Sequence, residues 1–173
     1  MQQMWSPWRS KHIERFDQDE REAGSGPSVF SRIAAEDRDE DNLVLWRGTH
    51  VFVVMNLYPY NNGHLLIVPY REVADYEALT EAEQQEMTRT IAACIRWLKR
   101  ALKPEGFNVG MNLGPASGAG IPQHLHMHVV PRWRGDTNFM PVVAEVKVIP
   151  EALHDTYRKL RAAVEASPLP PAP

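Results

Sequence analysis

The chain has 173 residues, a net charge of −3 at pH 7 and 43% hydrophobic residues. These values are typical of one globular domain and argue against a fully disordered chain and against a basic surface for duplex nucleic acid. Seven histidines stand against a single cysteine, which excludes an internal disulfide framework and a zinc site built from several cysteines of one chain.

The two ends of the chain are predicted to lie outside the packed core. Residues 1–30 read as an irregular arm of a single domain that ends at residue 166, and 167–173 read as a disordered, proline-rich tail. The arm lacks the apolar region of a secretory signal, and no stretch approaches the roughly 18 apolar residues of a membrane span. With a single cysteine, this pattern predicts a cytoplasmic protein without a membrane partner.

Five apolar segments predict strands. The first is 42–46, the second is the valine-rich 50–55, and the third is 64–68, which follows a turn rich in proline, asparagine and glycine. Segment 107–112 alternates apolar and polar residues, and the fifth strand is expected over 124–132. The short turns between the early strands favour a mainly antiparallel sheet.

Two helices are predicted. Thr80 and Glu83 form a capping-box pattern, after which apolar residues recur at helical spacing until Pro104. Cys94 falls on the apolar side of this long helix, so we expect a buried core residue rather than a nucleophile. A C-terminal helix is predicted over 150–166. The order of strands and helices indicates an α+β fold in which the helices are segregated from the sheet.

The segment 123–131 alternates with a period of two. In an extended strand His124, His126 and His128 would share one exposed face, while the apolar residues between them would point into the core. A polar outer face that happens to use histidine is one interpretation. A metal site is another, with His50 or His64 as a further ligand.

The third interpretation is nucleophilic chemistry at phosphorus. A neutral imidazole is a nucleophile at pH 7, and flanking imidazoles can donate hydrogen bonds to phosphoryl oxygens and to a leaving group. The loop 112–120 lies directly upstream and holds three glycines, which allow backbone amides to approach an anion closely. A glycine-rich loop that leads into a row of histidines favours this third interpretation.

The sequence His-Leu-His-Met-His-Val-Val at 124–130 resembles the motif of the histidine triad (HIT) superfamily of nucleotide hydrolases and transferases. Segments 56–59 and 63–69 are similar to the central hairpin of that family, and 4–9 and 131–141 resemble its diadenosine tetraphosphate (Ap4A) phosphorylase branch. The resemblance implies a HIT-like fold, with a sheet of about five mainly antiparallel strands, one long helix and a C-terminal helix. It also implies a homodimer whose sheets pair.

The resemblance also implies a role for each histidine. His126 would attack the α-phosphate to give a nucleotidyl-histidine intermediate, while His124 and His128 would bind phosphate oxygens and assist the leaving group. The other substrate-binding residues that it implies are Asn112, Gly118, Ala119 and Gly120 at the phosphates, Asn56 at the ribose, His64 beside the triad, Phe30, Ile33, Leu57 and Leu66 around the base, and Trp133 as a cover. The base-pocket residues and Trp133 are equally interpreted as ordinary packing residues.

The chain departs from the family pattern at two places. Many relatives carry Cys-x-x-Cys where this chain has Ser28 and Ser31, and there the cysteines hold a structural zinc with the first triad histidine and a histidine at the position of His50. The serines therefore predict that zinc is lost and that no metal cofactor is present. Ala119 and Gly120 stand where relatives carry glutamine or serine, so backbone amides or the Ser117 hydroxyl would have to bind phosphate.

The resemblance implies an enzyme that cleaves a dinucleoside polyphosphate by phosphorolysis, with inorganic phosphate as the acceptor. A HIT nucleotide hydrolase or a nucleoside phosphoramidase, both of which use water, is the first alternative. A nucleotide-binding regulatory module with little turnover is the second. Arg132 and Arg134 would add positive potential near the end of the histidine strand, or would be solvated surface residues.

Overall fold

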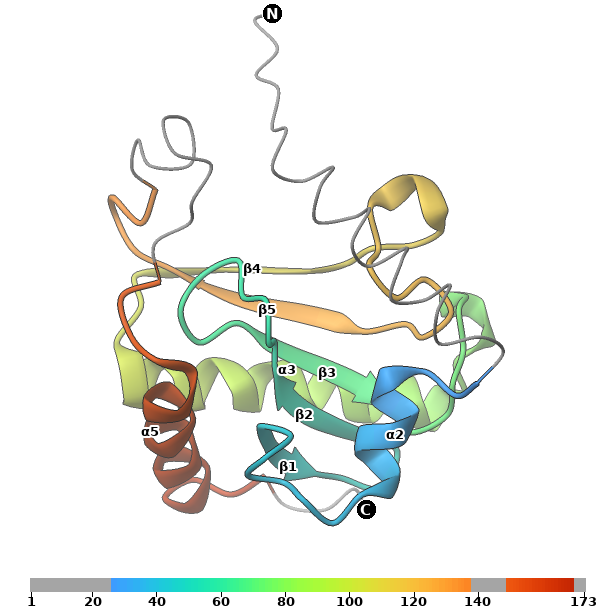
Figure 1. Cartoon of the computed structure of the whole chain (residues 1–173), viewed down its shortest axis with the longest axis horizontal. Coiled ribbons are helices and arrows are strands. Elements are labelled where there is room, and N and C mark those ends of the chain that lie inside the picture. Colours follow the sequence, from blue (N-terminus) through green and yellow to red (C-terminus); the bar gives the residue numbers. More distant parts are fainter. Residues whose placement is uncertain (1–25, 138–148, 170–173) are drawn as a thin grey trace, which may run out of the picture.

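The computed structural model of the protein describes residues 26–137 and 149–169. One antiparallel sheet has five strands in the spatial order β1-β2-β3-β5-β4. In chain order the elements are α2 (Val29–Ala35), β1 (Val44–Arg47), β2 (Val51–Met55), β3 (Leu65–Pro69), η1 (Tyr76–Ala78), α3 (Glu81–Leu102), β4 (Gly106–Met111), η2 (Pro115–Ser117), β5 (Met127–Arg132) and α5 (Leu153–Glu165) (Figure 1). The predicted α+β class, the antiparallel sheet and both predicted helices are confirmed.

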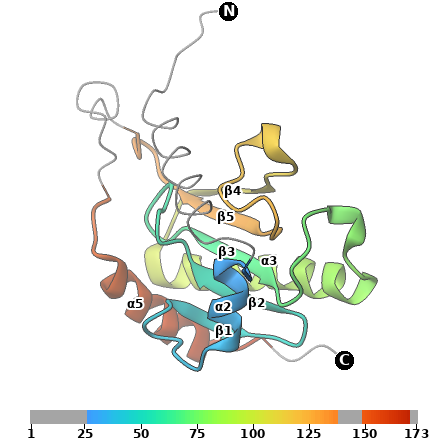
Figure 2. The same ribbon diagram turned by 45° about the vertical axis from the view of Figure 1, so that its right-hand side comes forward.

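The two faces of the sheet bury different side chains. On one face, residues such as Val53 and Ile67 pack in the main core with α3 and α5. On the opposite face, Phe52 and Leu66 pack against Phe30 of α2. The short helix α2 and the long helix α3 therefore lie on opposite sides of the sheet (Figure 1 and Figure 2).

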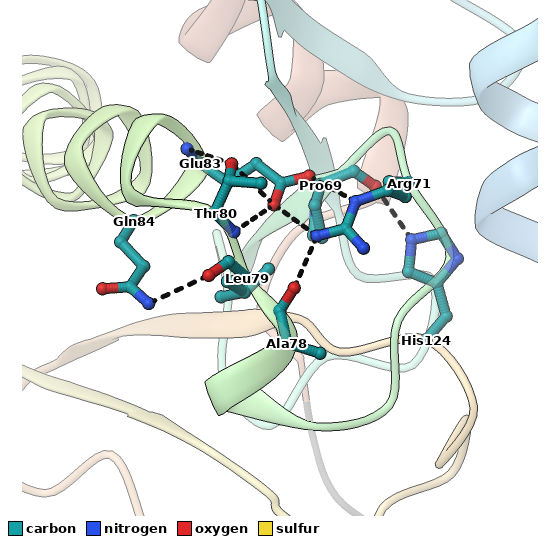
Figure 3. A network of polar contacts seen from close by, with 8 residues as sticks. All are labelled: Pro69, Arg71, Ala78, Leu79, Thr80, Glu83, Gln84 and His124. Carbon is teal, nitrogen blue, oxygen red and sulfur yellow. Dashed lines mark hydrogen bonds and ion pairs between the residues drawn. The ribbon is translucent and has the colours of Figure 1, made fainter.

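The long helix α3 begins at a hydrogen-bonded cap. The Thr80 hydroxyl accepts from the Glu83 amide at 3.3 Å, and the Glu83 carboxylate accepts from the Thr80 amide at 2.7 Å, so the predicted capping box is confirmed. The guanidinium of Arg71 lies 2.7 Å from the same carboxylate and lowers the pKa of Glu83 to about 2 (Figure 3). Cys94 is fully buried in the core, as expected, and burial raises the pKa of its thiol.

The fifth strand is shorter than the sequence predicts. β5 begins at Met127, so His124 and His126 precede the strand instead of lying in it. The pairing of β5 with β3 starts where Met127 faces Ile67. Just before this point, the Leu125 amide donates to the Val73 carbonyl at 2.7 Å, which takes the backbone out of the ladder.

Two further boundaries differ from the predictions. α2 begins at Val29, before the end of the predicted irregular arm, because the Ser28 hydroxyl accepts from the Ser31 amide and caps the helix. At the other end, residues 167–169 were expected to be disordered. The Trp97 indole donates to the Ser167 carbonyl at 2.8 Å and the partly buried Leu169 packs against the main core, so residues 167–169 contact the rest of the fold.

Residues 1–25, 138–148 and 170–173 lie outside the described structure. The resemblance at 4–9, part of the segment 131–141 and the end of the predicted tail therefore stay predictions, as does the division into a single domain over 1–166. Within the described ranges, no helix has the length and apolar character that crossing a bilayer requires.

Candidate active site

The three histidines of the motif lie together on the α2 side of the sheet. His128 is in β5, between Leu66 of β3 and Gly110 of β4. The centroid of its ring is 4.8 Å from that of His126. Phe30 of α2 covers the other two rings, with its centroid 5.1 Å from His126 and 5.5 Å from His124.

The predicted row of imidazoles is thus present, but the prediction of an exposed face is wrong. His124 is fully buried, and the His126 residue is 8% exposed. The reason is that α2, which the sequence analysis did not predict, packs its Phe30 ring against both side chains.

The hydrogen bonds of His126 assign its tautomer. Its Nδ1 lies 2.9 Å from the His124 carbonyl oxygen. A carbonyl oxygen can only accept, so Nδ1 carries the proton and Nε2 carries the lone pair. Burial lowers the pKa of His126, and the ring is therefore neutral at pH 7. A neutral imidazole with an unprotonated Nε2 is a nucleophile.

A second chain of hydrogen bonds assigns the tautomer of His128. The Tyr60 amide donates to His64 Nδ1 at 3.1 Å, so this nitrogen is unprotonated and the proton of His64 lies on Nε2. His64 Nε2 then donates to His128 Nδ1 at 2.9 Å. The remaining nitrogen of His128, Nε2, must carry the proton of the neutral ring. Burial, aided by the neighbouring His126, lowers the pKa of His128 to about 4.

The Nε2–H group of His128 lacks an acceptor. Among the described residues, it is the one buried side-chain nitrogen or oxygen without a hydrogen-bond partner. Buried donors are nearly always paired, so an unpaired one next to an open space indicates a place for a ligand oxygen. Gly110, which faces His128 across the ladder, borders such a space, because a Cβ atom there would have no heavy atom within 4 Å.

The site is neutral rather than cationic at pH 7. Burial is the largest cause of the lowered pKa of His64, His124, His126 and His128 alike, and for His64 the pKa falls well below its usual value. The arrangement therefore places a nucleophilic nitrogen beside a hydrogen-bond donor, without a charged imidazole. His64 lies beside the triad and binds His128 directly, while its part in the reaction stays a prediction.

A further group of polar residues surrounds the His124 ring. Its Nε2 lies 2.8 Å from the Pro69 carbonyl (Figure 3), and its Nδ1 lies 2.6 Å from the Ser28 hydroxyl. The Glu72 carboxylate accepts from the Ser31 hydroxyl at 2.6 Å and from the Ser28 amide at 3.0 Å. Four side chains, those of Ser28, Ser31, Glu72 and His124, thus form one connected group.

Glu72 was not predicted from the sequence, and His50 was named only as a possible metal ligand and as the position where relatives carry a zinc-binding histidine. The hydrogen bonds described for His50 are made by its backbone, whose amide donates to Glu86 and whose carbonyl accepts from Tyr70. Little in the sequence indicates that Glu72 belongs to the site, because its serine partners lie 41 and 44 residues earlier in the chain. Its position three residues after β3 was the one available hint.

This group does not suit zinc. Structural zinc is held by thiolate sulfur, imidazole nitrogen or carboxylate oxygen, and two of the four side chains here are neutral hydroxyls. In the described ranges, no three or more histidine, cysteine and acidic side chains gather closely enough to hold a metal ion. His64, the other proposed third ligand, is engaged with His128 instead.

The hairpin residues fall partly at the site. The Asn56 side chain donates to His64 Nδ1 at 3.2 Å and accepts from the Tyr58 amide at 3.0 Å, so in this structure it supports the hairpin. Leu57 is 59% exposed and lies in the loop between β2 and β3. Phe30 and Leu66 are buried on the α2 side, and Ile33 packs against the same cluster.

The glycine-rich loop and the basic residues are less closely tied to the triad. Gly118 directly follows η2 and has a φ of 78°, and Ala119 and Gly120 come next in the loop toward β5. The Ser117 hydroxyl, which could bind phosphate, donates to the Gly114 carbonyl. Asn112 follows the last residue of β4, where the continuing register would set it opposite His126. At the other end of β5, the Trp133 amide donates to Asp136, and Arg132 pairs with the same carboxylate. The contacts described for these two residues do not include the triad.

Comparison with known proteins shows close relatives. A family model described as the HIT domain matches residues 37–135. AP-4-A phosphorylase from Mycobacterium tuberculosis is 43% identical over 162 residues, which cover 92% of this chain and 83% of the relative. Bis(5'-adenosyl)-triphosphatase from Saccharomyces cerevisiae is 32% identical over 109 residues, 62% of this chain and 50% of the relative. The crystal structure of a zinc-bound histidine triad family protein from Mycobacterium smegmatis has a TM-score of 0.66 at 23% identity, covering 83% of this chain and 96% of that one.

Proposed function

Since this chain belongs to the HIT family, we propose that it is an enzyme that cleaves dinucleoside polyphosphates such as Ap4A at an α-phosphate, through a nucleotidyl-histidine intermediate. One observation carries the proposal. The hydrogen bonds assign a lone pair to His126 Nε2 and a proton without an acceptor to His128 Nε2, in rings 4.8 Å apart. Attack at phosphorus needs both a nucleophile and a donor for the oxygens that gain charge.

The first step forms one bond and breaks one. His126 Nε2 attacks the α-phosphorus of Ap4A, the bond from that phosphorus to the bridging oxygen breaks, and ATP leaves. The Nε2–H group of His128 donates to a phosphoryl oxygen or to the bridging oxygen as negative charge builds on it. Because the His124 carbonyl holds the Nδ1 proton of His126, that oxygen also stabilises the positive charge that the attacking ring acquires.

The second step decides the products. Inorganic phosphate would attack the nucleotidyl-histidine to release ADP and regenerate His126, whereas water would release AMP. The relative that supports phosphate as the acceptor is 43% identical and aligns with 92% of this chain, whereas the triphosphatase aligns with 62% of it. Phosphorolysis is therefore the proposed reaction, and hydrolysis is the alternative.

The test compares the products formed from Ap4A with and without inorganic phosphate. ATP together with phosphate-dependent ADP supports the phosphorylase, and ATP together with AMP in the absence of phosphate supports the hydrolase. The variant His126→Ala is expected to lose turnover by at least about 10³-fold and to keep nucleotide binding. Turnover close to wild type in this variant would contradict a nucleophilic His126. Binding without products in the wild-type protein would instead support a regulatory nucleotide-binding module.

The proposed assembly is a homodimer that joins two sheets at β4. This strand is at one edge of the sheet, and its residues Asn108, Val109 and Gly110 are exposed. An uncovered edge strand offers unpaired amides and carbonyls to a second copy. Light scattering of the purified protein would give a dimer mass, and a monomer at micromolar concentration would refute this assembly.

Two further parts of the proposal concern the cofactor and the compartment. The reaction is proposed to need no zinc, since Ser28 and Ser31 supply hydroxyls where thiolates would be required. Dialysis against a strong chelator should leave the turnover of Ap4A unchanged, and a loss restored by zinc would contradict this part. A cytoplasmic location stays a prediction from the sequence.

A further inference from the structure

Glu72, Ser31 and Ser28 form a continuous set of hydrogen bonds that ends at the His124 ring, and we call it the serine–glutamate chain. Glu72 Oε2 lies 2.6 Å from the Ser31 hydroxyl, the Ser31 amide donates to Ser28 Oγ at 3.1 Å, and Ser28 Oγ is 2.6 Å from His124 Nδ1. Ser28 is 3% exposed and His124 is fully buried. This link is buried at its His124 end and reaches the exposed Glu72 carboxylate at the other, and it is not explained by the chemistry proposed for His126 and His128.

The direction of each hydrogen bond follows from the acceptors at its two ends. The Pro69 carbonyl 2.8 Å from His124 Nε2 can only accept, so this nitrogen carries the proton of the neutral ring. His124 Nδ1 is then an acceptor, and the Ser28 hydroxyl donates to it. At the other end the carboxylate can only accept, so the Ser31 hydroxyl donates to Glu72. The Ser31 hydroxyl and the Ser28 amide lower the pKa of Glu72, which keeps it ionised.

We propose that Glu72 is a positioning residue, which acts through Ser31 and Ser28 to hold the ring of His124. The same residue, His124, presents the carbonyl that fixes the Nδ1 proton of His126. The serine–glutamate chain therefore selects the tautomer of the nucleophile from a distance of four hydrogen bonds, without touching the substrate. This inference rests on the role proposed for His126.

The structural comparison gives the inference its context. The histidine triad protein from Mycobacterium smegmatis binds zinc, whereas the cluster around His124 in this chain offers hydroxyls in the places where thiolates are expected for zinc. A zinc ion fixes a ligating imidazole by direct coordination. In this chain the Glu72 carboxylate and the hydroxyls of Ser28 and Ser31 fix the His124 ring through hydrogen bonds. Because both serines belong to the start of α2, these bonds also hold α2 against the triad without metal.

The test replaces Glu72 in the full-length protein and measures both turnover and histidine tautomers. Glu72→Ala is expected to lower kcat for Ap4A by about 10- to 100-fold, with KM within about twofold of wild type, because the substrate contacts are unchanged. Glu72→Gln is expected to recover kcat to within about threefold of wild type. Both bonds of the carboxylate go to Oε2, and a single amide oxygen can accept both. Glu77→Ala removes a nearby exposed carboxylate and is the matched control.

Nitrogen-15 spectra of the histidine side chains provide a readout that does not depend on activity. In the wild-type protein they should show the proton of His126 on Nδ1 and the proton of His124 on Nε2. Glu72→Ala should change the His124 Nδ1 shift and increase the share of the Nε2–H tautomer of His126. A residue with a merely structural role would lower thermal stability without moving the tautomers or the kcat of the folded protein.

The outcomes separate this inference from the proposed function. Wild-type kcat and wild-type tautomers in Glu72→Ala would overturn the positioning role, whatever the substrate is. If Glu72→Ala does not fold, Ser31→Ala carries the test, because it removes a single hydroxyl from the chain, and wild-type kcat and tautomers in that variant would overturn the inference. An inactive wild-type protein would refute the proposed function alone, since the spectra still report on the serine–glutamate chain.

Discussion

The histidine cluster predicts a specific loss of stability in mild acid. His128 has a pKa of about 4 in the folded protein, against a usual value of 6.5. As the pH falls below 6.5, the unfolded chain binds a proton at this ring while the folded protein does not, so unfolding becomes progressively more favourable until about pH 4. With these two pKa values, the free energy of unfolding falls by about 2 kcal/mol between pH 7 and pH 4.5 through His128 alone.

Urea denaturation followed by tryptophan fluorescence at pH 7, 6, 5 and 4.5 measures this loss. This pH range stays above the titration of carboxylates such as Glu83, whose contribution to stability is lost between pH 4.5 and about 2. In the variant His128→Gln, the decrease from pH 7 to pH 4.5 should be smaller than in wild type by about 2 kcal/mol. His154→Gln removes an exposed histidine of α5 and controls for the loss of a histidine as such. An equal decrease in wild type and His128→Gln would refute the reasoning.

Two further predictions concern how the hairpin and the β1–β2 turn are held. Gly63 has a φ of +73°, and a Cβ atom there would lie 2.4 Å from Leu102 Cδ1. Gly63→Ala should therefore cost about 1–3 kcal/mol in urea denaturation and lower kcat by moving the adjacent His64, and wild-type values of both would contradict this. Glu86 is 4% exposed and its carboxylate accepts from three successive backbone amides at 49–51. Glu86→Ala should cost about 3 kcal/mol by the same assay, and a loss below about 1 kcal/mol would show that water replaces the carboxylate.

Local patterns were sufficient for most of the fold. The Thr80–Glu83 cap and the apolar period of α3 are each set by residues a few positions apart, and both are present in the structure. The errors arose where distant contacts decide. β5 starts late because Leu125 bonds to Val73, and residues 167–169 pack because Trp97 reaches Ser167 from α3.

The candidate site divides in the same way. The amino-acid sequence by itself indicated which three imidazoles lie together and, through its likeness to the HIT family, the chemistry proposed for them, although only His128 lies in the strand. Only the tertiary structure decided the protonation of each ring. That depends on the Pro69 carbonyl 55 residues from His124, on His64 beside His128, and on Glu72 behind two serines. A hydrogen bond takes its direction from the group that folding brings to each nitrogen, and no local pattern in the chain encodes that group.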